Sequence, residues 1–162
     1  MKRFIKTALF VLLPFMLLGC TPDTETEEID HALNEKVKTD DSLTIVVTDV
    51  QRADRHGWDY LLFFVTVTSN KAMGSVNVTD PPYGYNLKLT KKSQPTSADY
   101  ISSDSSLAPN ETMSFEVGFK YQDYFTNYST VVFRFFKNGE KSLFFDDSFK
   151  RTWVLDNPTY AS

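Results

Sequence analysis

Short runs of alternating apolar and polar residues follow one another from Ser42 onward. In the run SLTIVVTDV (42–50), the apolar residues Leu43, Ile45 and Val47 share one face, whereas WDYLLFFVTVT (58–68) is apolar on both faces over its first half. Successive side chains of a strand point to opposite faces of the sheet. The first run therefore predicts a strand with one buried face. The second predicts a central strand that is covered on both sides for part of its length.

The same alternation recurs further along the chain. It is found in YGYNLKLT (83–90), TMSFEVGF (112–119), STVVFRFFK (129–137) and KSLFF (141–145), with a last strand expected around residues 151–155. Asn138-Gly139 separates two of these runs and predicts a hairpin. Short strands, frequent turn signals and the lack of a long helical pattern predict an all-β fold. We expect an antiparallel sandwich of seven to eight strands, with a small closed barrel as the alternative.

Residues 1–19 have a different pattern, which is typical of a signal peptide. A basic start is followed by an apolar stretch from Ala8 to Leu18, interrupted only by Pro14, and then by Gly19. This order is that of a secretory leader. The apolar stretch is shorter than the roughly 20 residues that a spanning helix needs, which disfavours a permanent transmembrane anchor.

The segment Leu17-Leu18-Gly19-Cys20 resembles the lipobox of bacterial lipoproteins. The resemblance implies that Cys20 becomes the first residue of the mature chain and carries a diacylglycerol on its sulfur. Two acyl chains would anchor the protein stably to a membrane, on its extracytoplasmic face. Cys20 is the only cysteine, so a disulfide within the chain is excluded. An ordinary signal peptide with an incidental cysteine is the alternative.

The stretch from Cys20 to Asp41 is strongly acidic and has no aromatic residue. Residues 21–41 contain eight acidic side chains against Lys36 and Lys38, whereas residues 42–162 are close to neutral. We interpret 20–41 as a solvated tether and 42–162 as the folded domain. A short helix over residues 28–37 is the alternative, because Ile29, Leu33 and Val37 would share one face. Without a basic surface, nucleic-acid binding is not expected.

A second resemblance covers about residues 42–155. The runs LTIVVTDV, LLFFVTVTSN, LAPNET, SFEVGF and VVFRFF are similar to the Ig-like domains of unknown function found in bacterial lipoproteins. The telokin-like fold of the immunoprotective extracellular antigens is the related structure. The resemblance implies an Ig-like sandwich, and it transfers no catalytic residue because that family has no agreed ones.

Catalytic and metal-binding patterns are weak in this sequence. The two histidines, His31 and His56, lack an identifiable nucleophile or base beside them. Aspartates near His56 (Asp54, Asp59) and the pair Asp146-Asp147 are hard oxygen ligands, but their spacing is not that of a calcium loop. We therefore predict no enzyme, no metal and no cofactor.

Aromatic residues are the more unusual feature, at 15% of the chain. Many must fill the core, but some lie next to turn signals and suggest a binding surface for a protein or a cell-wall ligand. These candidates are Tyr83, Tyr85, Tyr121, Tyr124, Phe125 and Tyr128. The alternative is structural, with Tyr128 forming a tyrosine corner and the others capping the core.

The expected function is that of a membrane-anchored, non-enzymatic interaction domain on the cell envelope. An accessory or sensor subunit of a membrane complex is the alternative.

Overall fold

In the computed structural model, the residues described are 29–39, 43–70, 76–81, 83–102, 106–138 and 145–160, with the side chains of 138 and 145–149 left aside. The strands are β1 (Asp30–His31), β2 (Val37–Lys38), β3 (Leu43–Arg55), β4 (Trp58–Ser69), β5 (Tyr83–Lys88), β6 (Thr96–Ser97), β7 (Tyr100–Ile101), β8 (Thr112–Lys120), β9 (Thr130–Asn138) and β10 (Phe145–Asp156); a single 3₁₀ turn, η1 (Asp123–Asn127), joins β8 to β9. The leader and Cys20 lie outside these residues.

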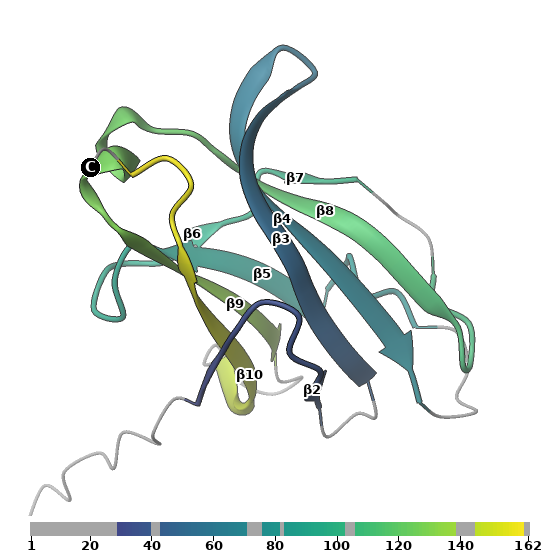
Figure 1. The fold of residues 1–162 in the computed structure, drawn as a ribbon. Coiled ribbons are helices and arrows are strands. Elements are labelled where there is room, and N and C mark those ends of the chain that lie inside the picture. The colour runs from purple at the N-terminus through teal and green to yellow at the C-terminus, as the bar shows by residue number, and fades with distance from the viewer. Residues whose placement is uncertain are drawn as a thin grey trace, which may run out of the picture.

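The strands form two five-stranded sheets that pack face to face (Figure 1). One sheet has the order β1-β10-β9-β5-β6 and the other β2-β3-β4-β8-β7, and the described strands do not close into a barrel. The predicted all-β sandwich is thus confirmed. Six strands are long, and the four edge strands β1, β6, β2 and β7 are two residues each. Very short edge strands limit pairing with other chains.

The longest hairpin, β3–β4, turns at His56-Gly57. Both residues have positive φ, 56° and 79°, as a two-residue type I′ turn requires. The side chain of Asp54 accepts a hydrogen bond from the Gly57 N–H at 3.2 Å, which stabilises the turn. Beyond it, β4 lies at the centre of its sheet, with Leu61 and Phe63 buried on the inner face and Tyr60 and Leu62 buried on the outer one. The expectation of a strand covered on both sides is confirmed for this half of β4.

Aromatic rings from both sheets fill the interior. Phe63 on β4 stacks on Phe133 on β9 across the sheets, with centroids 4.6 Å apart and an interplanar angle of 17°. Phe119 and Trp153 pack against Phe133 at 6.3 and 5.9 Å. Stacked and edge-on rings of this kind stabilise a core beyond the area they bury. They compensate for the absence of a disulfide.

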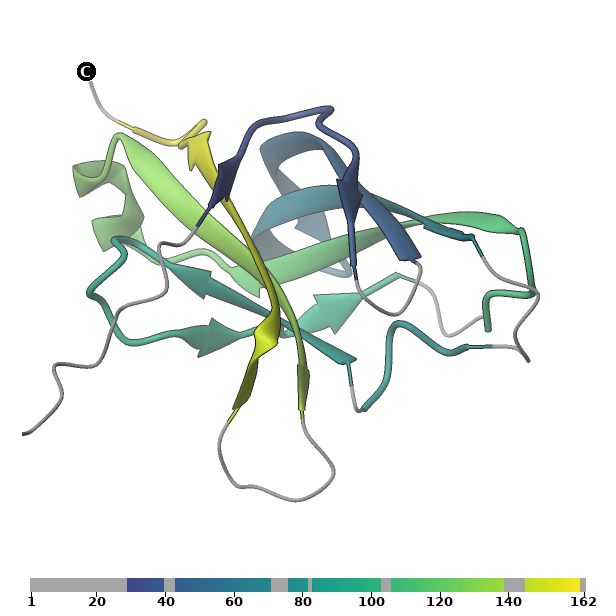
Figure 2. The ribbon, with the colours of Figure 1, turned by 90° about the horizontal axis from the view of Figure 1, so that it is seen from below.

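Residues 29–39 differ from the sequence expectation, because they belong to the sandwich and form no helix. β1 pairs in parallel with β10, and β2 pairs antiparallel with β3, so the segment crosses one side of the sandwich from sheet to sheet (Figure 2). Val37 is buried, and the N–H of Asn34, at a φ of 63°, donates to the carbonyl of Val47 at 2.8 Å. The helical spacing of Ile29, Leu33 and Val37 is not realised, because this segment pairs with one edge of each sheet through β1 and β2.

The β9–β10 hairpin also differs in detail. Of the expected strand KSLFF (141–145), only Phe145 lies within the described residues, and it begins β10. The same strand contains the expected 151–155 and pairs with β9 along both of its ends. A register irregularity between Asp146 and Arg151 separates the two paired stretches. The predicted Asn138-Gly139 turn falls at 139–144, which lies outside the described residues. A bulged strand gives the same pattern of apolar runs as two separate strands.

Candidate functional site

The six aromatic candidates do not form one surface. Tyr85 and Phe125 are each only 3% exposed and belong to the core. Tyr83 lies opposite Lys137, near the last residues of β9, whereas Tyr128 precedes the first residue of the same strand. The rings on β5 and the rings of the β8–β9 connection therefore lie at opposite ends of the sandwich. They cannot contact one small ligand together.

The other candidates vary in exposure. Tyr83 is partly buried and stacks on Phe135 at 5.7 Å. Tyr121 is also partly buried, and the guanidinium of Arg52 lies 3.6 Å from the centre of its ring. Tyr128 is partly buried, and only Tyr124 is mostly exposed, at 51%. Two of the six candidates thus belong to the core, and the other four remain at least partly exposed.

The structural alternative placed a tyrosine corner at Tyr128, but the tyrosine whose hydroxyl bonds to a loop here is Tyr85. It donates to the carbonyl of Val78 at 2.9 Å inside the core, and burial raises the pKa of this phenol well above its usual value. The η1 turn is held by Asn157 instead, whose amide donates at 2.8 Å to the carbonyls of both Phe125 and Tyr128. The sequence analysis missed Asn157, for which the Asn-Pro pair after the last strand was the available signal.

The most exposed aromatic residue of the described chain was also missed. Trp58 follows the β3–β4 turn, is 59% exposed, and has the ammonium of Lys120 at 4.5 Å from its ring centre. Its neighbour Asp59 accepts from the Nε of Arg52 at 2.8 Å. Since side chains alternate along β4, Trp58 and Asp59 point to opposite faces of the hairpin. The two cation–ring pairs are therefore separate and do not converge on a ligand.

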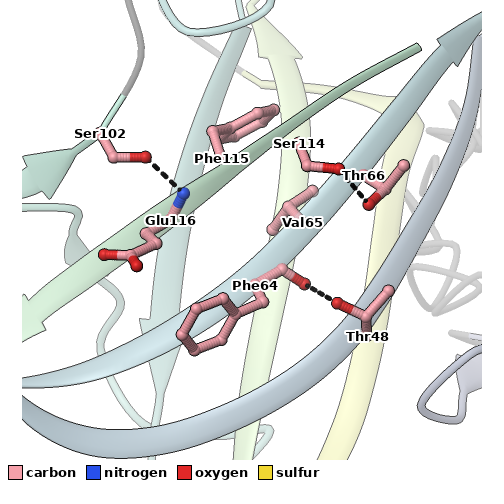
Figure 3. A pocket seen from close by; sticks show the side chains of 8 residues that line it. All are labelled: Thr48, Phe64, Val65, Thr66, Ser102, Ser114, Phe115 and Glu116. Carbon is pink, nitrogen blue, oxygen red and sulfur yellow. Dashed lines mark hydrogen bonds between the residues drawn. The ribbon is translucent and has the colours of Figure 1, made fainter.

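A shallow groove lies on the outer face of the β2-β3-β4-β8-β7 sheet (Figure 3). We call it the sheet-face groove, and its volume is about 300 Å³. It is lined by Thr48, Phe64, Val65, Thr66, Ser102, Ser114, Phe115 and Glu116. These residues come from β3, β4, β8 and Ser102, which directly follows β7, so the groove runs across the strands. No sequence pattern pointed to this groove, because each strand contributes only one or two small polar residues to it.

Hydrogen bonds hold the polar groups of the sheet-face groove in place. The hydroxyls of Thr66 and Ser114 are 2.8 Å apart, and the hydroxyl of Thr48 donates to the carbonyl of Phe64 at 3.2 Å (Figure 3). The hydroxyl of Ser102 accepts from the N–H of Glu116 at 2.7 Å. Thr48 is the extra residue of an irregularity in the β3–β4 pairing, where Val47 faces Val65 and Asp49 faces Phe64. Such a bulge re-aims side chains at a sheet surface.

A bidentate ion pair lies at one end of the sheet-face groove. The Nε and Nη2 atoms of Arg55 donate to the two carboxylate oxygens of Glu116 at 2.8 and 2.9 Å. These bonds lower the pKa of Glu116 and raise that of Arg55. Glu116 is therefore ionised at ordinary pH, and Arg55 balances its charge. It is not poised to exchange a proton as a general acid or base.

The residues considered for metal or acid–base chemistry are dispersed. Asp54 caps the hairpin turn, Asp59 binds Arg52, and the His56 ring packs 5.7 Å from that of Tyr100. Within the described part of the chain, His, Cys, Asp and Glu form no group of three or more that could hold a metal ion. Asp146 and Asp147 lie in β10, and their side chains are outside the description.

Over the described ranges, the structure contains no helix with the length and apolar character of a membrane-spanning segment. Comparisons of the chain with protein-family models, with curated proteins and with solved structures found no match.

Proposed function

We propose that this protein is an extracytoplasmic lipoprotein, acylated at Cys20, whose non-enzymatic Ig-like domain binds a ligand in the sheet-face groove. The observation that carries the proposal is the groove itself. It offers an aromatic ring, several hydroxyls and a neutralised ion pair on one rigid sheet. Binding sites commonly combine apolar surface with a few fixed polar groups. The pairing of Glu116 with Arg55 favours binding over catalysis.

The proposed anchor would limit how far from the membrane the groove can act. Eight residues separate Cys20 from Ile29, where the described sandwich begins. A fully extended chain of that length spans at most about 30 Å. The domain would thus stay close to the membrane surface, because its tether would be much shorter than the whole 20–41 segment.

The anchor is tested by substituting Cys20. We expect Cys20→Ser to abolish incorporation of labelled palmitate and to move the protein from the membrane fraction to the soluble fraction, since the thioether cannot form. A Ser162→Cys variant in the same background is the control, because it restores a thiol but not at the lipobox. Palmitate labelling that persists in Cys20→Ser would exclude the proposed anchor.

The binding role is tested by crosslinking in intact cells. A photoreactive amino acid at Ser114, within the sheet-face groove, should capture an envelope component that the same label at Thr130 does not. Thr130 is a suitable control because it is exposed and lies on the opposite sheet. Equal capture from both positions, or none from Ser114, would contradict a binding role for the groove.

An accessory or sensor subunit is the second candidate. It is favoured by Ile29 and Leu33, which are 73% and 37% exposed on the segment nearest the anchor. Exposed apolar side chains beside a membrane anchor suit contact with a neighbouring envelope protein. Replacing residues 21–28 with a neutral linker of equal length, or Ile29 and Leu33 with serine, should disrupt such an assembly and leave binding in the groove unchanged.

A further inference from the structure

The hydroxyls of the sheet-face groove keep hydrogen-bonding capacity after their internal bonds are counted. Each hydroxyl has one donor and two acceptor positions. In the Thr66–Ser114 pair only one of the two protons is used, and Ser102, which accepts from Glu116, still has its own proton to donate. Thr48 donates to Phe64 and can still accept. The groove therefore presents donors and acceptors side by side.

The hydroxyl surface continues along the sheet beyond the groove. Strand register places Thr44, Thr68 and Thr112 in one row across β3, β4 and β8. The hydroxyls of Thr68 and Thr112 are 2.9 Å apart, and the amide of Asn70 donates to Thr44 at 2.7 Å. Adjacent strands lie about 4.8 Å apart. The result is a strip of small, oriented polar groups that an extended ligand could follow.

The charge of the groove limits the kind of ligand. Glu116 is the only carboxylate among the described residues that line it, and Arg55 balances its charge through two hydrogen bonds. An anionic ligand would meet that carboxylate, and a cationic ligand would have to displace the arginine. A strongly apolar ligand would leave the hydroxyls without partners, which is costly. An uncharged, many-hydroxyl ligand fits all three conditions.

Phe64 supplies the apolar component. Its ring is partly buried on the outer face of β4, between the hydroxyl of Thr48 and the Glu116 carboxylate (Figure 3). The C–H face of a sugar ring can pack on such a ring while its hydroxyls bond to groups beside it. An extended peptide would also find donors and acceptors here, but it makes no comparable use of a flat ring flanked by hydroxyls.

We propose that the sheet-face groove is a binding site for a neutral glycan, with Phe64 as the stacking platform and Thr66, Ser114 and Ser102 as hydrogen-bonding groups. Glu116, fixed by Arg55, accepts from a sugar hydroxyl at the end of the groove. This inference rests on the proposed binding role of the groove and adds the chemical class of the ligand.

The test uses the full-length protein in phosphatidylcholine nanodiscs, which contain no sugar. Chitotetraose, cellotetraose and maltotetraose are titrated by calorimetry, and backbone amide shifts of Thr66, Ser114 and Glu116 are followed by NMR. The three sugars distinguish an amino-sugar cell-wall glycan from glucose polymers. We expect saturable binding of at least one of them, with shifts confined to the groove and its neighbouring strip.

Variants separate a specific site from general surface adsorption. Phe64→Leu keeps an apolar side chain but loses the flat ring, and should weaken binding by about tenfold or more. Thr66→Val removes one hydroxyl at constant shape and should weaken it about threefold to tenfold. Thr130→Val, an exposed threonine on the other sheet, is the control and should change nothing. Circular dichroism confirms that each variant is folded.

Three outcomes would overturn the proposal: no binding of any neutral sugar at millimolar concentration, undiminished binding by folded Phe64→Leu, or tighter binding of tetragalacturonate or an uncharged Gly-Ser peptide than of the neutral sugars. The crosslinking experiment at Ser114 distinguishes failure of the glycan proposal from failure of the proposed binding role. Capture of a protein from Ser114 without sugar binding would reject the glycan and keep the binding role. Failure of both would reject both.

Discussion

The interior between the sheets and the outer face of the β2-β3-β4-β8-β7 sheet use opposite chemistry on the same strands. On β4, Phe63 and Val65 point inward, while Thr66 and Thr68 point outward. Among the described residues, eight of those buried between the sheets are aromatic, whereas the groove on the outer face has small hydroxyls around Phe64. Part of the high aromatic content that suggested a binding surface is thus a property of the core.

This difference shows what composition can and cannot indicate. A disulfide-free sandwich must obtain its stability from buried apolar area, and rings bury the most area per residue. Threonine and serine are common on exposed sheets, so their enrichment on one face is visible only once the strands are in register. A ring-rich sequence therefore predicts the core better than it predicts the site.

The largest effect is expected for Phe133, at the centre of the interior. It is fully buried and stacked on Phe63, so Phe133→Ala should lower the free energy of unfolding by about 3–5 kcal/mol, measured by urea denaturation. Phe64→Leu, on the outer face, should cost less than about 1.5 kcal/mol. If Phe133→Ala does not fold, Phe133→Leu keeps the measurement possible. Equal losses at the two positions would contradict the division into core and surface.

Asn157 tests whether buried polar groups also hold the interior together. Asn157→Ala removes both hydrogen bonds to the carbonyls of Phe125 and Tyr128, and should cost about 1–3 kcal/mol in thermal or urea unfolding. Asn157→Asp should be comparably destabilising, because a carboxylate oxygen, which only accepts hydrogen bonds, would then face the two carbonyl oxygens. Thr159→Val, which loses only the bond from Thr159 to Asn157, is the milder control. An unchanged unfolding midpoint in Asn157→Asp would show that the η1 turn does not depend on these hydrogen bonds.

The sequence predicted the parts of the fold that depend on local alternation. The long strands β3, β4, β5, β8 and β9 follow from their period-two patterns, and the sandwich follows from their number and turns. The short strands β1 and β2 were missed because two residues carry no periodicity, and only pairing with β10 and β3 identifies them. The sheet-face groove depends on the bulge at Thr48 and on contacts between distant strands. Neither feature is encoded in any single segment.

Tyr85 gives a smaller effect that depends on alkaline pH. Tyr85→Phe keeps the ring but removes the bond to the Val78 carbonyl, and should cost about 0.5–1.5 kcal/mol at neutral pH. Burial raises the pKa of this phenol in the folded state, so the wild type loses stability as pH rises above about 10, the usual tyrosine value. The variant lacks this loss. The wild type and Tyr85→Phe should therefore differ less in free energy of unfolding at pH 10.5 than at pH 7. An equal difference at the two pH values would argue against a buried phenol.

The smallest effect on stability is expected for the ion pair on the outer face, and this effect depends on acidic pH. Arg55 and Glu116 have side chains 30% and 21% exposed, and such partly solvated pairs contribute at most about 1 kcal/mol. Hydrogen bonding to Arg55 lowers the pKa of Glu116 in the folded state, so the stabilisation is complete above the unfolded value of 4.5 and is lost as pH falls through the folded value. Glu116→Gln should be slightly less stable than the wild type at pH 7 and should match it at low pH. Because Tyr85 responds only to alkali and Glu116 only to acid, urea unfolding of the two variants across pH separates the interior from the outer face. A Glu116→Gln deficit that persists at acid pH would mean that this side chain contributes by packing and not by its charge.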